Sequence, residues 1–325
     1  MIFLGCDGGS TKTEFLIADE SGKILAHRIF SGCNYSYLGR DDFASLMEHA
    51  ISTVLFDAGL LPTDLTGCLF GLPSYGEIPE TETEIPAILT AILGPVPFRI
   101  VNDAVVGWGG ALGGLPGINV VSGTGSIVYG IDPAGNECRV GGWSLLFCDE
   151  GSCSWVGREV IRAFTMQADG RLPRTPLYDV IREELKLTRD QYFSEFLQVT
   201  CRNDSASLAA LQPLALRALA QGDETIRAIY ERAADELSRA ALAVKHRLEF
   251  PADAPVRVSY SGGLFRAGDV VLTPFRKRLE AENCIFCTPR YSPIVGAVAV
   301  AAMQHLSPEK LTVLLDTVSA VLTTA

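Results

Sequence analysis

Gly5-Cys6-Asp7-Gly8-Gly9-Ser10-Thr11-Lys12-Thr13 decides the fold class of this chain, and its glycines before Lys-Thr suggest a phosphate-binding loop. The stretch departs from the P-loop pattern G-x-x-x-x-G-K-[ST], because Thr11 precedes Lys12 where that pattern has glycine. The run that follows, Glu14–Ala18, is short and apolar and stops at a turn cluster, which is typical of a strand. The stretch is therefore predicted to form a hairpin with a glycine turn.

A glycine turn in a hairpin suits an anion. Without Cβ atoms, backbone N–H groups can approach phosphate oxygens closely. Asp7 would be out of place against a bare phosphate, but its carboxylate fits a site in which Mg²⁺ lies between it and the phosphate oxygens. Taken alone, the stretch is equally consistent with an ordinary Gly-Gly hairpin.

The composition sets the class of protein. A length of 325 residues favours two domains, and 48% hydrophobic with 20% charged residues is typical of a soluble globular chain. The net charge of −11 argues against a nucleic-acid or anionic-membrane partner, since both require a basic surface. It does not exclude a nucleotide, because local N–H groups and a metal can hold phosphate in an acidic protein.

The sequence favours a cytoplasmic location. The N-terminus has no basic region and Asp7 interrupts its apolar start, so no secretion signal is predicted. The longest apolar runs, 294–303 and 85–93, are about half as long as a bilayer span requires. Nine scattered cysteines indicate a reduced protein, and the lone Cys284–Cys287 pair is predicted to belong to a buried strand instead of a zinc site.

Strands alternate with helices in the first third of the chain, which predicts an α/β sheet with helices on its faces. Ligands bind such sheets beyond the carboxyl ends of the strands, and Asp103 falls at such an end. The predicted elements are a helix over 43–55 capped by Asp41 or Asp42, a strand at 68–70, a helix over 79–93, a strand at 98–101 and a helix over 104–112.

The opening design then repeats. A strand at 118–121, the glycine turn Ser122–Ser126 and a strand at 127–131 follow the same order as the first hairpin. Two such hairpins on two similar domains could hold one polyphosphate from both sides. The remainder is predicted to be helical over 154–250, followed by a strand at 256–260, the loop Ser261–Gly263, and helices near 270–280, 293–305 and from Pro308 onward.

Together these segments resemble the sugar kinase, hsp70 and actin superfamily, within it the BadF/BadG/BcrA/BcrD ATPases, and most closely the N-acetylglucosamine kinases of that family. The resemblance covers nearly the whole chain. The matching motifs are Asp7–Thr13 (first phosphate), Asn102–Ala104 (first connecting), Ser122–Ser126 (second phosphate), Ser261–Gly263 (adenosine), Pro293–Ala297 (second connecting), and Gly141-Gly142-Trp143 through Asp149–Ser152 with Trp155 (the sugar-side signature).

The resemblance implies two ribonuclease-H-like, actin-like ATPase domains with an interdomain cleft. The first domain would cover residues 1–114 together with the final helix, 307–325. The second would cover residues 115–306 and carry a large helical insertion. The hairpin duplication read from the residues agrees with this architecture.

The resemblance also implies an ATP- and Mg²⁺-dependent kinase that phosphorylates the C6 hydroxyl of an amino sugar, N-acetylglucosamine or glucosamine. Asp7 would be the metal-side carboxylate and Asp103 the base that accepts the hydroxyl proton. The expected ATP-binding residues are Gly8, Gly9, Ser10, Thr11, Lys12, Gly123, Thr124, Gly125, Gly262 and Gly263. The expected sugar-binding residues are Asn34, Asp103, Thr124, Gly125, Trp143, Asp149 and Glu150.

Several of these residues have structural alternatives. Asn102-Asp103 could cap a helix, Trp143 could be a core residue, and Asn34-Tyr35 could form only a turn. The sequence departs from the family pattern at Cys148, at Cys153 and in the loop Gly71–Gly76. All three are expected near the sugar pocket, which leaves the exact sugar open and the ATP half unaffected.

Two other functions stay open from the sequence. One is an activator ATPase for 2-hydroxyacyl-CoA or benzoyl-CoA reduction, and the other is a non-catalytic ATP- or sugar-binding regulator. The expected partners of a kinase are ATP and a small amino sugar, with no nucleic acid and no membrane, and the resemblance allows for a homodimer.

Overall fold

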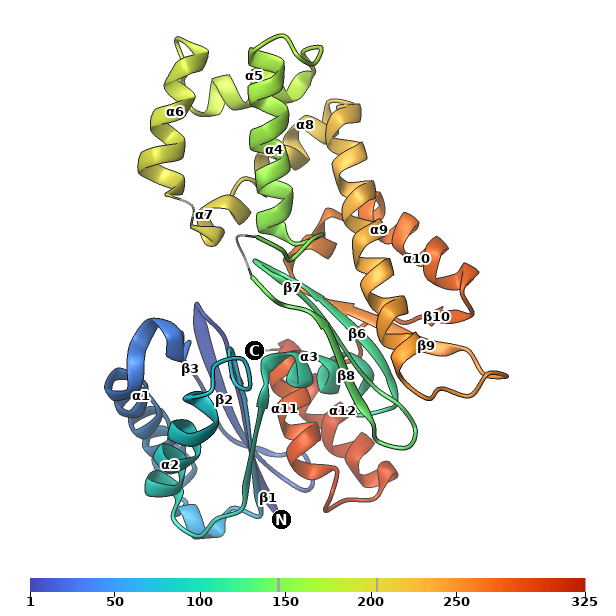
Figure 1. Ribbon diagram of the computed structural model, residues 1–325. Coiled ribbons are helices and arrows are strands. Elements are labelled where there is room, and N and C mark those ends of the chain that lie inside the picture. The colour runs from blue at the N-terminus through green and yellow to red at the C-terminus, as the bar shows by residue number, and fades with distance from the viewer. Residues whose placement is uncertain (145–146, 203, 325) are drawn as a thin grey trace. The chain divides into compact units, whose positions relative to one another are not determined.

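The computed structural model describes residues 1–144, 147–202 and 204–324, and Figure 1 shows its elements. Leu145 and Leu146, within the sugar-side signature, and Ala325, the end of the last predicted helix, lie outside the described residues. The chain divides into two compact units, Met1–Leu115 with Thr288–Ala325, and Pro116–Cys287. No helix in the described ranges is long and apolar enough to cross a membrane.

The first unit contains the predicted opening hairpin. Its strands β1 and β2 pair antiparallel with Gly8 opposite Thr13, and β3 continues the antiparallel pairing. On the other side of β1, β4 and then β5 run parallel to it. The sheet order is β3-β2-β1-β4-β5, with bounds β1 Ile2–Gly8, β2 Lys12–Asp19, β3 Ile24–Ser31, β4 Gly67–Leu72 and β5 Phe98–Asn102.

Helices cover both faces of this sheet (Figure 1). Helices α1 (Tyr35–Ala58) and α2 (Thr81–Leu93) pack on one face, over a core that includes Phe15, Phe43 and Phe70. Helix α1 begins earlier than the Asp41 or Asp42 cap predicts, because the Asn34 side chain accepts the Ser36 N–H and caps the helix there. Inside α1, Gly39 breaks the helical conformation with a φ of 72°.

Helices α3 (Asp103–Leu112) and α11 (Pro293–Ala302) cover the other face, and α12 (Pro308–Thr324) packs against α11. A Cβ on Gly110 would lie 2.5 Å from Ser292 O, so α3 and α11 meet backbone to backbone. This packing places residues 288–306 in the first unit, whereas the sequence assigned them to the second. The division between the units otherwise falls at 115/116, one residue from the expected boundary.

The second unit repeats the first sheet strand for strand. Its order is β8-β7-β6-β9-β10, with β6, β7 and β8 antiparallel and β9 and β10 parallel to β6. The predicted duplication of the hairpin design is therefore confirmed at the level of topology. The bounds are β6 Gly117–Ser122, β7 Ser126–Ile131, β8 Glu137–Gly141, β9 Val256–Ser261 and β10 Cys284–Phe286.

The Cys284–Cys287 segment forms the predicted strand, but it is not fully buried. Ile285 is 46% exposed, because β10 is an edge strand of the second sheet.

The predicted helical insertion lies between β8 and β9, and helix α10 (Asp269–Ala281) follows β9 and packs with α9. Within the predicted helical region, residues 205–220 form two helices, α7 and α8. The insertion comprises α4 Cys153–Ala168, α5 Pro176–Glu184, α6 Phe193–Glu195 within a helical stretch from Asp190 to Cys201, α7 Ser205–Ala209, α8 Gln212–Ala220 and α9 Glu224–Arg247.

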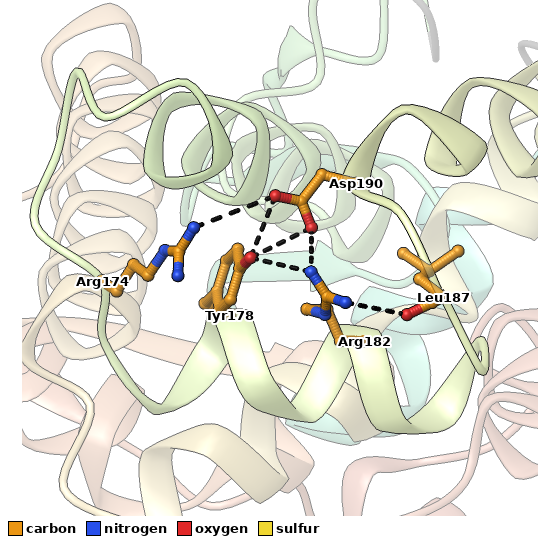
Figure 2. A network of polar contacts seen from close by, with 5 residues as sticks. All are labelled: Arg174, Tyr178, Arg182, Leu187 and Asp190. Atoms are coloured by element: carbon orange, nitrogen blue, oxygen red, sulfur yellow. Dashed lines mark hydrogen bonds and ion pairs between the residues drawn. The ribbon is translucent and has the colours of Figure 1, made fainter.

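A polar network fixes α5 to the segment that follows it, as Figure 2 shows. The Tyr178 hydroxyl donates to the Asp190 carboxylate at 2.9 Å, and Arg182 pairs with the same carboxylate. Arg182 also donates to Leu187 O at 3.1 Å, and the Arg174 guanidinium lies 4.0 Å from the Tyr178 ring centroid. These contacts hold the outer part of the insertion together.

Candidate active site

The turn of the first hairpin is held by backbone hydrogen bonds and by close contacts at Gly8 and Gly32 that favour glycine. Gly9 N–H donates to Lys12 O at 2.9 Å, and Gly9 O accepts the Cys33 N–H at 3.0 Å. A Cβ on Gly8 would lie 2.6 Å from Cys33 Sγ, and one on Gly32 would lie 2.1 Å from Ser10 O. The turn is thus fixed at its base, while Ser10 and Thr11 at its tip are exposed.

Asp7 and Asp103 lie close enough for their charges to interact. Burial, and after it the nearby charges of Asp103 and Glu14, raise the pKa of Asp7 to about 7 against the opposing effect of Lys12. The topology explains the proximity, since Asp7 pairs with Gly71 on β4, and Asp103 follows directly on Asn102, which pairs with Leu72 at the end of β4. Asn102 accepts the Ala104 N–H, so the cap of α3 is Asn102 and the Asp103 carboxylate is not the capping group.

A carboxylate whose pKa is raised by burial and by a neighbouring carboxylate marks a site that favours a cation. Among the described residues there is no cluster of three or more His, Cys, Asp or Glu that could hold a metal by itself. Mg²⁺ usually takes only one or two carboxylates and completes its shell with water and substrate phosphates. Asp7 and Asp103 fit that requirement.

Lys12 does not extend freely over the glycine turn. Its Nζ donates to Glu14 Oε2 at 2.8 Å, and the other oxygen of Glu14 lies 2.8 Å from His27 Nε2. Burial alone would raise the pKa of Glu14, but the hydrogen bonds from Lys12 and His27 outweigh it and lower the pKa. The Lys12 ammonium is therefore partly neutralised at the edge of the loop.

Asn34 contacts the first loop as well as capping α1. Its Nδ2 donates to Ser10 Oγ at 3.2 Å, while its Oδ1 holds the helix start. The side chain is 9% exposed. The structure thus gives Asn34 a structural role beside the phosphate turn, and its contact with sugar stays a prediction.

Sequence reasoning missed polar residues beyond the end of β4. Ser74 Oγ lies 3.4 Å from Ser36 Oγ, and Glu77 Oε1 accepts the Asn102 Nδ2–H at 3.1 Å. Ser74 has a φ of 66°, a left-handed conformation that costs energy for a residue with a side chain and often marks a functional site. Their place after the carboxyl end of a strand was the available signal.

The second hairpin turn repeats the bonds of the first. Gly123 N–H donates to Gly125 O at 2.9 Å, and Gly123 O accepts the Cys153 N–H at 2.9 Å. In addition, Ser154 N–H donates to Thr124 O at 3.3 Å, which ties the turn to the start of α4. Thr124 itself is exposed at the tip.

The sugar-side signature is attached to this second turn. Ser126 Oγ donates to Glu150 O at 2.9 Å, and Ser122 Oγ donates to Gly151 O at 2.8 Å. Asp149 is buried with a φ of 56°, burial raises the pKa of its carboxyl, and its Oδ1 has no hydrogen-bond partner among the described residues.

Trp143 is not a core residue, because 83% of its side chain is exposed. It lines an open pocket of about 350 Å³ together with Cys148, Asp149, Glu150 and apolar residues of α9 such as Leu237. The pocket combines an aromatic side chain, three carboxylates including Glu236, the Arg239 guanidinium and an apolar wall. That combination suits a ligand with hydroxyls on one side and C–H groups on the other.

The adenosine motif packs directly on the second phosphate turn. Gly262 has a φ of 105°, and a Cβ there would lie 2.2 Å from Ser122 O. A Cβ on Gly263 would lie 3.6 Å from Cys153 Sγ. Cys153 thus contacts the second phosphate turn and the loop at Gly263, and its expected place near the sugar pocket stays a prediction.

Sequence comparisons agree across nearly the full length. A model of the BadF/BadG/BcrA/BcrD ATPase family matches residues 4–301. The chain is 27% identical over 310 residues to the N-acetyl-D-glucosamine kinase of Dictyostelium discoideum, with 92% of this chain and 97% of the relative covered. It is 28% identical over 307 residues to the N-acetylmuramic acid/N-acetylglucosamine kinase of Clostridium acetobutylicum, with the same coverage.

Solved structures share the fold. A structural-genomics target from Chromobacterium violaceum that carries the assignment N-acetylglucosamine kinase aligns with a TM-score of 0.72 at 25% identity, covering 92% of this chain and 98% of that one. The ROK hexokinase of Thermus thermophilus aligns with a TM-score of 0.59 at 17% identity, covering 94% of this chain and 99% of that one, and shows the fold alone.

Proposed function

Because the chain belongs to the BadF/BadG/BcrA/BcrD ATPase family, we propose that it is an ATP-dependent amino sugar kinase. The observation that carries the proposal is the pair of interacting carboxylates, Asp7 and Asp103, at the end of strands beside a glycine turn. Phosphoryl transfer needs a positioned base and stabilisation of phosphate charge, and this arrangement offers both. The activator and regulator alternatives have less support, since the similar curated proteins are kinases.

Asp103 is the proposed base. The sugar hydroxyl oxygen attacks the γ-phosphorus of ATP, its proton passes to the Asp103 carboxylate, and ADP leaves with the electrons of the broken P–O bond. Asp7 would hold Mg²⁺, which supplies neutralisation of phosphate charge when bound. The backbone N–H groups of the two glycine turns, at residues 8–12 and 123–125, would bind the phosphates, and Gly262-Gly263 would accommodate the adenosine.

The proposed sugar is N-acetylglucosamine or glucosamine, phosphorylated at the primary C6 hydroxyl. Trp143 would cover the C–H face of the ring, and Asp149 and Glu150 would accept hydrogen bonds from hydroxyls, because these three residues line one pocket. The amide of Asn34 is a further proposed sugar contact. We further propose a cytoplasmic homodimer, which light scattering of the purified protein would test.

The test is an ADP-release assay across a panel of amino sugars and hexoses, combined with Asp103→Asn. We expect sugar-dependent ADP release that is fastest with N-acetylglucosamine or glucosamine and that falls by at least about a hundredfold in Asp103→Asn. ATP binding and the far-UV circular dichroism of the variant should match the wild type. Full turnover in Asp103→Asn would exclude it as the base, and ATP binding without sugar-dependent ADP release would favour a regulator.

A further inference from the structure

Cys153, the first residue of α4, contacts both nucleotide motifs of the second unit. Its N–H donates to Gly123 O in the phosphate turn, and its Sγ lies 3.6 Å from the Cβ position of Gly263 in the adenosine motif. The side chain is only 5% exposed, so packing fixes its position. Contacts that hold Cys153 in place therefore also act on the phosphate turn and on the adenosine motif.

Two residues of the helical insertion lie behind Cys153. Its thiol donates to Gln212 Oε1 at 3.1 Å, at the start of α8. Tyr230 of α9 is fully buried, and burial raises the pKa of its phenol. The Gln212 side chain opposes this rise, which shows that its amide lies beside the Tyr230 hydroxyl. Gln212 Nε2 and the Tyr230 hydroxyl are buried, and within the described ranges neither has a hydrogen-bond partner of good geometry.

The Gln212 amide has a second orientation, in which the directions of its contacts with Cys153 and Tyr230 are reversed. A half-turn about its last side-chain bond exchanges oxygen and nitrogen within nearly the same volume. Tyr230 O–H then donates to Oε1, and Nε2–H donates to the Cys153 sulfur. In either orientation the Gln212 amide joins Tyr230 of α9, through α8, to Cys153 at the start of α4. Burial makes unpaired polar groups costly, which favours keeping these three side chains together.

The backbone around Cys153 is held by the same insertion. A Cβ on Gly157 would lie 2.1 Å from Leu208 O of α7, and one on Gly151 would lie 2.8 Å from Ala233 O of α9. Three helices of the insertion thus contact the segment that carries Cys153. Among these contacts, the bond to Gln212 is the one that the Cys153 side chain itself makes.

We propose that Gln212 and Tyr230 are positioning residues for ATP: they hold Cys153, and through it they keep the second phosphate turn and the adenosine motif in place. This rests on the proposed function only for the identity of the nucleotide. It assigns a role to the helical insertion, whose residues no sequence motif connects with nucleotide binding.

The test compares Gln212→Ala, Tyr230→Phe and Cys153→Ala in the full chain. We expect the KM and the Kd for ATP to rise about three- to tenfold, as for a coupling of moderate strength, with the sugar KM unchanged. Amide hydrogen exchange should accelerate in the peptide covering 122–126. The peptide covering 8–13, whose Gly9–Cys33 bond is the equivalent contact in the first unit, should exchange as in the wild type. Cys153→Ser, which keeps a group of similar size that can both donate and accept a hydrogen bond, should retain most of the ATP affinity.

Matched controls are Cys201→Ser, another buried cysteine of the insertion, and Tyr178→Phe, which removes a buried tyrosine hydroxyl from the network of Figure 2. Both should leave ATP binding unchanged. An unaltered ATP Kd and unaltered exchange at 122–126 in a folded Gln212→Ala would overturn the proposal, and so would an equal rise in the sugar KM. If Gln212→Ala does not fold, Tyr230→Phe decides, because it removes only one oxygen.

The two proposals fail separately. If no sugar supports ADP release, the kinase assignment fails, but ATP titration and hydrogen exchange still decide the role of Gln212 and Tyr230.

Discussion

At the scale of single residues, the unusual group is Asp7. A carboxyl with a pKa near 7 is ionised in the folded protein only at an energetic cost, and burial and the charge of Asp103 are the causes. The same cost becomes useful when a cation is bound, because the cation stabilises both carboxylates at once. The metal-free protein is thus less stable than it would be without this pair of carboxylates. Such like-charge pairs are common at functional sites.

Asp7→Asn should stabilise the metal-free protein in a pH-dependent way. The folded-state pKa of about 7 lies above the ordinary value of 3.8, so the folded state binds more protons between these values and its stability falls as pH rises through them. The variant escapes this loss. Its gain in the free energy of unfolding should be on the order of 2 kcal/mol larger at pH 8 than at pH 5.

Urea unfolding at the two pH values in the absence of Mg²⁺ measures this difference. Asp103→Asn is the matched variant, because it removes one of the charges that raise the pKa of Asp7, and it should show a smaller gain of the same sign. A gain in Asp7→Asn that is equal at both pH values would contradict the shifted pKa.

At the scale of elements, the second phosphate turn depends on a glycine in another loop. Gly262→Ala should weaken ATP binding more than tenfold and destabilise the protein by about 3 kcal/mol, because the new Cβ would overlap Ser122 O and the φ of 105° disfavours a side chain. Isothermal titration with ATP and urea unfolding measure the two effects.

Gly268→Ala is the control for Gly262→Ala. Gly268 also has a positive φ, 74°, but nothing lies within 4 Å of its Cβ position. It should cost only the conformational strain, about 1 kcal/mol, and leave ATP binding intact. Equal losses in the two variants would show that φ, and not contact with the phosphate turn, determines the requirement for glycine.

Within the helical insertion, the buried carboxylate of Asp223 joins two helices. Asp223 caps α9 and is 1% exposed. Its carboxylate accepts the Ile226 N–H at 3.0 Å, the Leu177 N–H at 2.7 Å and the Thr175 hydroxyl at 2.6 Å. Asp223→Ala should cost about 3 kcal/mol, since buried donors of two helices lose their acceptor. Thermal denaturation should show a large loss for this variant.

Asp204→Ala provides the comparison at an exposed cap. Asp204 caps α7 through the Ser207 N–H at 2.8 Å, and its loss should cost about 1 kcal/mol. If the two variants lose equal stability, the contacts of Asp223 with Thr175 and Leu177 contribute nothing beyond capping.

At the scale of the whole molecule, the two units differ in the number of chain segments that form them. The second unit is one continuous segment with its own core, whereas the first needs residues 288–325 to complete it. Residues 116–287 expressed alone should therefore fold and unfold cooperatively. Residues 1–115 alone should not, because the face of β1 and the glycines of α3 would lose α11.

Circular dichroism and the dispersion of amide NMR signals measure both fragments. A chain in which 288–325 is joined to 1–115 by a short glycine linker should recover the fold of the first unit. A folded 1–115 fragment without that addition would show that α11 is dispensable for the core.

The sequence by itself determined the elements whose signals are local. Glycine turns between apolar runs predicted both hairpins, and apolar periodicity predicted the helical insertion. Motifs in a fixed order indicated the family, and the roles they give to Asp7, Asp103 and Gly262 stay predictions. Such features depend on neighbours in the chain, so they can be read without a structure.

Only the tertiary structure decided the relations between distant segments. It showed that Asp103 raises the pKa of Asp7, that residues 288–306 belong to the first unit, and that Cys153 lies against the nucleotide motifs with Gln212 and Tyr230 behind it. Each relation joins residues separated by many positions. Their contacts depend on how whole helices and strands pack, which leaves no periodic or local signal in the sequence.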